Sequence, residues 1–98
     1  MRILLSDSKN LKIQDVNISS IVVNENFLLL EIQDKNYNYE TKSLKEGTDI
    51  LNNIKTISDN DLLYLKVSNF NTSVVKVSKI NLIKENKFFE TPENFYKG

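Results

Sequence analysis

Ser43-Leu44-Lys45-Glu46, with the apolar residues that follow it, decides the fold that we predict for this 98-residue chain. Its Ser-x-x-Glu spacing is that of a capping box, in which the serine accepts from the third helical N–H and the glutamate reaches back. Apolar residues then recur at the three- and four-residue spacing of a helix packed on one side: Leu44, Ile50, Leu51, Ile54 and Ile57. We therefore expect one helix over residues 44–57, with a first turn weakened by Gly47.

On both sides of this helix, apolar and polar residues alternate as they do in half-buried β-strands. Residues 27–32 and 37–41 flank a polar stretch and predict a β-hairpin, and residues 62–67 predict a further strand. The alternation slips by one residue at Asp15, where we expect a bulge or a strand break, and slips again at Lys79. The predicted fold class is α+β, a small and mostly antiparallel β-sheet with one central helix packed on it.

The length allows one domain, because a globule of 11.4 kDa buries only about 65% of the surface of its unfolded chain. We assign residues 1–85 to a single β-rich domain and residues 86–98 to an aromatic C-terminal tail. This tail holds four aromatic residues around its proline: Phe88, Phe89, Phe95 and Tyr96. They either close over the edge of the core or dock on another protein.

The composition argues against catalysis. The chain has no Cys and no His, which removes thiol nucleophiles, disulfides, zinc sites of the usual ligands and the commonest general acid–base. Gly47 and Gly98 are the only glycines, so there is no glycine-rich phosphate loop. Asp59 and Asp61 are more simply explained as a turn than as paired catalytic carboxylates. We expect no enzyme activity, no cofactor and no metal.

The charges are balanced, with 13 basic and 13 acidic residues, which argues weakly against a binder driven by electrostatics. Lysines 76, 79, 84 and 87 form a local excess, but on an alternating strand they do not all share a face. That pattern favours a solvated strand surface over a nucleic-acid interface. A single arginine, Arg2, leaves little capacity for bidentate readout of guanine.

The order of elements from Ile3 to Ile83 resembles a LytTR-type DNA-binding domain. The stretches that carry the resemblance are Ile13-Gln14-Asp15-Val16, residues 39–46 (YETKSLKE) and residues 71–80 (NTSVVKVSKI). The chain departs from the family pattern at Asn71, where the family usually has Arg, and at Lys76, where it has Asn. The resemblance implies DNA contacts from loops, and it points to Asn24 and Asn26 and to Asn69 and Asn71 as candidates. If the chain binds nucleic acid, Lys76 and Lys79 are the further candidates.

We therefore expect a non-enzymatic protein-binding module, such as a small inhibitor, immunity or accessory protein of a phage or other mobile element. Another protein is the expected partner, and the four tail aromatics are its expected contact residues. The alternative is a stand-alone LytTR-like DNA-binding regulator, and a third possibility is an assembly subunit that pairs through an exposed edge strand. The longest apolar run, residues 27–30, is far too short to cross a membrane, so we expect a cytoplasmic protein. The oligomeric state is left open.

Overall fold

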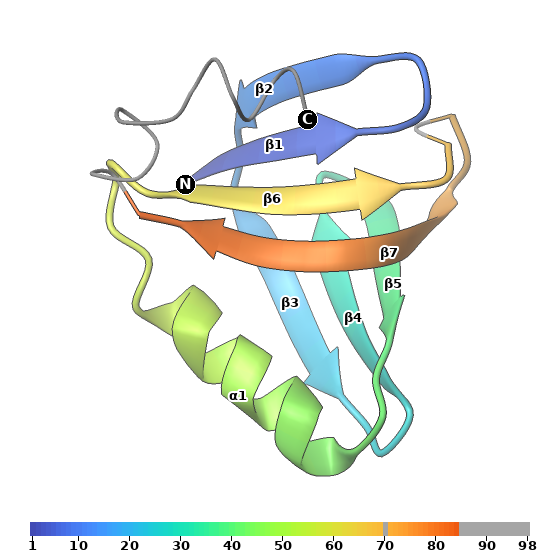
Figure 1. Ribbon diagram of the computed structural model, residues 1–98, viewed down its shortest axis with the longest axis vertical. Helices are drawn as coiled ribbons and strands as arrows, with labels where there is room; N and C mark the ends of the chain where they lie inside the picture. The colour runs from blue at the N-terminus through green and yellow to red at the C-terminus, as the bar shows by residue number, and fades with distance from the viewer. Residues whose placement is uncertain (70, 85–98) are drawn as a thin grey trace.

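The computed structural model describes residues 1–69 and 71–84, which form seven strands and one helix (Figure 1). In chain order these are β1 (Arg2–Ser6), β2 (Leu11–Asp15), β3 (Ile18–Val23), β4 (Phe27–Ile32), β5 (Lys35–Glu40), α1 (Leu44–Lys55), β6 (Leu62–Val67) and β7 (Val74–Ile83). The predicted aromatic tail, residues 86–98, lies outside the described residues.

All seven strands belong to one sheet, in the order β2-β1-β6-β7-β5-β4-β3. Four of the six strand pairs are antiparallel, which confirms the predicted mostly antiparallel sheet. The pairs β1/β6 and β5/β7 are parallel, so the sheet is mixed. Each parallel pair joins strands far apart in the chain, a pairing that local sequence patterns do not reveal.

The sheet is curled, because β2 and β3 lie at its opposite edges although only residues 16 and 17 separate them in the chain. Figure 1 shows the consequence: β2, β1, β6 and β7 form one half, and β5, β4 and β3 cross behind it at a steep angle. Val16 is 4% exposed at this crossing, and its N–H donates to the carbonyl oxygen of Met1 at 2.8 Å. The slip at Asp15 is thus a strand break, at which the chain leaves one edge of the sheet for the other.

The hydrophobic core lies on the inner face of the curled sheet. Its strand residues follow the period of two that the sequence shows: Ile3, Leu5, Leu28, Leu30, Ile32, Tyr37, Leu63, Leu65, Val67, Val75 and Val77. Leu4 and Leu62 are also buried but point to the outer face, because they alternate with these core residues along β1 and β6. One side of the sheet is therefore the core, and part of the other side is apolar as well.

The predicted hairpin is β4 and β5, joined by a two-residue turn. Gln33 and Asp34 have φ of 48° and 65°, and positive φ at both central residues matches the right-handed twist of a hairpin. The turn is therefore shorter than the polar stretch 33–36 indicates, and β5 already begins at Lys35.

The helix begins where the capping box places it. The Oγ atom of Ser43 accepts from the N–H of Glu46 at 3.2 Å, and the Glu46 carboxylate accepts from the N–H of Lys42 at 3.2 Å. The helix ends at Lys55, two residues before the predicted end, and Ile54 inserts into the core at 5% exposed. It contacts β3 and β4, the two strands at one edge of the sheet.

The slip predicted at Lys79 is a β-bulge between β6 and β7. Lys66 lies opposite Lys79, and the next residue, Val67, lies opposite Val77, so Ser78 is the extra residue. Because of this extra residue, Val77 faces the core while Lys76 and Lys79 both point outward. Lys76 and Lys79 therefore share the outer face of β7, which strict alternation along the strand does not predict.

Candidate functional site

The strand β2 is one of the two edges of the sheet, and no described element pairs with its outer side. It pairs with β1 in an antiparallel register in which Val16 donates to Met1 and Asp7 donates to Asn10. Because bonded and non-bonded pairs alternate in such a ladder, the N–H and C=O groups of the odd-numbered residues of β2 point away from β1. These residues are Leu11, Ile13 and Asp15.

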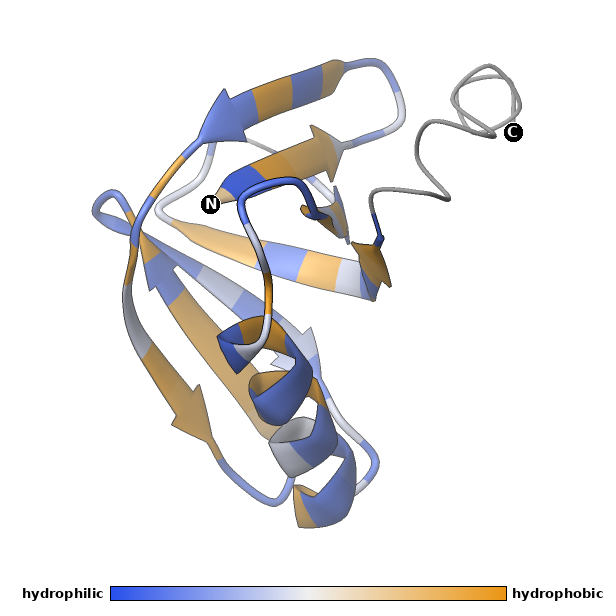
Figure 2. Ribbon diagram, turned by 90° about the vertical axis from the view of Figure 1, so that its left-hand side faces the viewer, coloured by the Kyte–Doolittle hydropathy of each residue, from blue (hydrophilic) through white to orange (hydrophobic). Residues whose placement is uncertain are grey.

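The side chains of β2 match this open edge. Leu11 is 48% exposed and Ile13 is 45% exposed, and both lie on the outer face, where Ile13 is the partner of the buried Leu4. Figure 2 shows the alternation of apolar and polar residues along this strand. On the inner face, Lys12 and Gln14 line a small hollow of about 90 Å³. The strand thus presents apolar side chains outward and polar ones toward the open side of the curled sheet.

The opposite edge of the sheet is β3, which contacts the helix α1. The N–H of Asn24 donates to Phe27 at 2.9 Å, so the outward backbone groups belong to Ile21 and Val23. The helix α1 packs beside Val23, and a Cβ added to Gly47 would lie 2.8 Å from the Cγ1 atom of Val23. Gly47 is therefore required for this close approach, which explains a residue that weakens the helix when considered alone.

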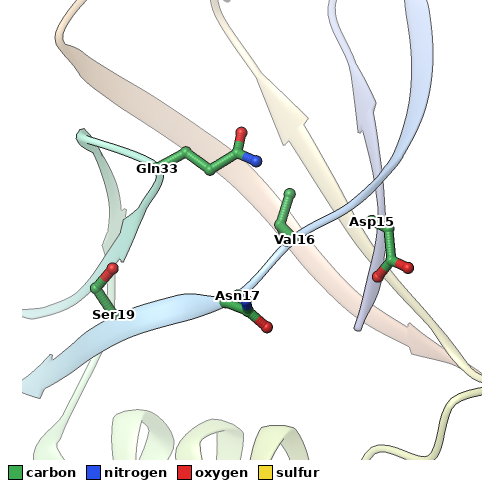
Figure 3. Close-up of a pocket in the computed structure, with 5 residues that line it drawn as sticks. All are labelled: Asp15, Val16, Asn17, Ser19 and Gln33. Atoms are coloured by element: carbon green, nitrogen blue, oxygen red, sulfur yellow. The ribbon is translucent and has the colours of Figure 1, made fainter.

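A polar hollow of about 440 Å³ lies at the bend between β2 and β3 (Figure 3). Val16 and the amide of Gln33 point toward one another, whereas the side chains of Asp15 and Asn17 point away from Gln33 (Figure 3). Asp15 accepts from the N-terminal amino group of Met1 at 3.1 Å and is 82% exposed. The hollow is lined by one carboxylate, that of Asp15, which pairs with this amino group, and by one hydroxyl, that of Ser19.

A second hollow, of about 460 Å³, lies on the outer face of β4, β5 and β7. It combines apolar and polar groups: Asn26, Phe27, Asn38, Glu40, Val74 and Lys76. The Oδ1 atom of Asn38 is buried and accepts no hydrogen bond. This hollow brings Asn26 and Lys76 together, two of the residues expected to contact DNA in the LytTR-like alternative.

The other implied residues are spread over the molecule. Asn24 and Asn26 precede β4, near the end of β5, because Asn26 accepts from the N–H of Thr41. Asn69 and Asn71 lie in the loop before β7, which meets the beginning of β5. The two asparagine pairs therefore lie at opposite ends of β5. Lys76 and Lys79 share the outer face of β7, and the four tail aromatics are not among the described residues.

Asp7 and Tyr37 have displaced pKa values, and neither marks a reaction site. The backbone N–H of Lys9 donates to Asp7 at 2.8 Å and is the main cause that lowers the pKa of this carboxyl. Burial in the core raises the pKa of Tyr37.

Within residues 1–69 and 71–84, no three acidic side chains gather as metal ligands. No helix in these ranges has the length and apolarity to span a membrane.

Comparison with known proteins gives no relative, since no family model, no curated protein and no solved structure matches this chain.

The sequence did not single out Leu11 and Ile13 as binding residues, because their alternation with Lys12 and Gln14 is that of any half-buried strand.

Proposed function

We propose that this protein is a non-enzymatic protein-binding module that receives an extended segment of its partner at β2. The observation that carries the proposal is the open β2 edge, with outward backbone groups at Leu11, Ile13 and Asp15. An added strand pairs with such groups through main-chain hydrogen bonds, and side chains on one face supply specificity. Leu11 and Ile13 supply that face here, since both remain about half exposed.

The two edges of the sheet support this choice of strand. Edge strands are liabilities that proteins cover, shorten or charge. The helix α1 packs against the Val23 side chain of β3 through Gly47, whereas β2 has no such contact with a described helix. An edge left open with apolar side chains beside it fits a surface kept for a partner. A small inhibitor, immunity or accessory protein of a mobile element is the biological role that we propose for such a module.

The LytTR-like reading remains a second proposal with less support. It relies on Asn24 and Asn26 acting together with Asn69 and Asn71, and these pairs lie at opposite ends of β5. An interface that uses both pairs has to span the length of this strand.

The substitution Ile13→Pro tests the proposal with little damage to the fold. Proline lacks an N–H, and the N–H of Ile13 points away from β1, so the β1/β2 ladder keeps its hydrogen bonds. The matched control is Val22→Pro, because Val22 is 47% exposed on the other edge strand. Its N–H bonds to β4, so this control should destabilise the sheet, whereas Ile13→Pro should preserve the circular dichroism spectrum.

Partner capture then gives the functional result. Wild-type protein and the conservative variant Ile13→Val should retain the same protein partner from a lysate of the source cells, and Ile13→Pro should lose it. Equal capture of that partner by folded Ile13→Pro would overturn the proposal, because strand addition at β2 needs the N–H of Ile13.

A further inference from the structure

Three lysines gather on the outer face of β6 and β7. Lys66 and Lys79 are direct cross-strand partners, and Lys76 lies beyond the bulge on the same face. All three are exposed, and none has an ion-pair partner in the described part of the chain. Like charges directly opposite each other in a sheet are destabilising, so the arrangement costs stability in the free protein.

The lysines continue into the outer hollow of about 460 Å³ through Lys76, which lines it. The ring of Phe27 and the side chain of Val74 give this hollow apolar walls, and Asn26 adds an exposed amide. Asn38 is the direct partner of Lys76 across β5 and β7, and its Oδ1 atom accepts no hydrogen bond. Glu40 is the one acidic side chain that lines the hollow.

We infer that this face binds single-stranded nucleic acid, with phosphates along Lys66, Lys76 and Lys79 and a base in the hollow against Phe27. Non-sequence-specific binding of single strands combines lysines that follow the backbone with aromatic rings on which bases stack. The inference is independent of the open edge, because β1 and β6 lie between β2 and the lysines of β7.

A single strand fits this surface better than a duplex. The ring that the surface offers is set in a hollow beside the lysines, and a base reaches it only when it is unstacked from a partner strand. The described face offers no arginine among the lysines for bidentate base readout, since Arg2 lies on β1. We therefore expect affinity without strong sequence preference.

Fluorescence anisotropy of the full chain with labelled oligothymidylate and oligouridylate of about fifteen nucleotides tests the inference. A duplex of the same length is the third probe. Wild-type protein should bind both single strands more tightly than the duplex, and salt should weaken the binding. The double variant Lys66→Gln/Lys79→Gln should reduce the slope of log affinity against log salt by about 1.4, which is about 0.7 for each lost phosphate contact.

The matched control is Lys45→Gln/Lys55→Gln, which removes the same charge from α1 and should leave the slope unchanged. Phe27→Leu keeps apolar volume but removes the ring, and it should weaken binding about fivefold or more with little change in the slope. Equal slopes for the two lysine double variants would overturn the inference. Tighter binding to the duplex, or no binding even at low salt, would overturn it as well.

Discussion

The contact between α1 and β3 makes a quantitative prediction about Gly47. In an exposed helix, alanine is more stable than glycine by about 1 kcal/mol. Here a Cβ at position 47 would lie 2.8 Å from the Cγ1 atom of Val23, whereas carbon atoms in contact are usually about 3.5–4.0 Å apart. Overpacking of this kind costs about 1–3 kcal/mol. The substitution Gly47→Ala should therefore fail to stabilise the protein, and it should destabilise it by up to about 2 kcal/mol.

A double-mutant cycle separates the contact from the helix propensity. In the Val23→Ala background the Cγ1 atom is absent, so Gly47→Ala should stabilise the protein by about 1 kcal/mol, as in an exposed helix. The coupling between the two positions should then be about 1–3 kcal/mol. Urea unfolding followed by circular dichroism measures all four proteins, provided that the slope with urea stays constant.

One result would refute the reasoning: the same stabilisation by Gly47→Ala in both backgrounds. It would mean that α1 does not pack on Val23. The contact with α1 would no longer distinguish β3 from β2, and the choice of β2 as the binding edge would lose this comparison.

Four further predictions test other parts of the structure. Thr41→Val should raise stability by about 1 kcal/mol in thermal unfolding, because it removes a buried hydroxyl without a hydrogen bond; a loss of stability would contradict this. Lys79→Gln should raise the melting temperature by relieving the repulsion of Lys66, and an unchanged value would show that the two charges do not interact. The folded state lowers the pKa of Asp7, so its carboxylate stabilises the protein at higher pH and loses this effect as it protonates below pH 3.8. Asp7→Asn should therefore make the stability of the protein fall less steeply as the pH decreases below 3.8. Parallel acid-unfolding profiles of the two proteins would contradict this. Leu30→Ala should cost about 2–5 kcal/mol in urea unfolding, because Leu30 is 0% exposed, and a cost below 1 kcal/mol would place it outside the core.

The local structure follows closely from the sequence. The spacing of Ser43 and Glu46 sets the start of α1, and the alternation of Leu63, Leu65 and Val67 identifies the core face of β6. These features depend on residues within a few positions of one another, so a single sequence is enough to reveal them. The strand break at Asp15 and the bulge near Lys79 follow from the same periodicity.

The arrangement of the strands could not be predicted, because it depends on contacts between distant residues. Nothing near Asp15 shows that β3 begins at the opposite edge of the sheet, and nothing near Gly47 shows that Val23 lies against it. The bulge at Ser78 also places Lys66 opposite Lys79, a pairing that the spacing along one strand does not contain. Both proposed surfaces depend on this long-range pairing.

The proposed function depends on β2 being open along one side and paired along the other. The N–H of Val16 donates to Met1, and that of Gln14 points to β1 in the same ladder, whereas the N–H groups of Leu11, Ile13 and Asp15 point away. Backbone hydrogen exchange distinguishes these two sets residue by residue, without knowledge of the partner.

Amide hydrogen exchange followed by NMR on the free protein is therefore the most direct measurement. The open edge predicts alternation, with slow exchange at Gln14 and Val16 and fast exchange at Leu11, Ile13 and Asp15. Slow exchange at all five amides in the free protein would show that the edge is already covered, and it would contradict the proposal that β2 receives the partner.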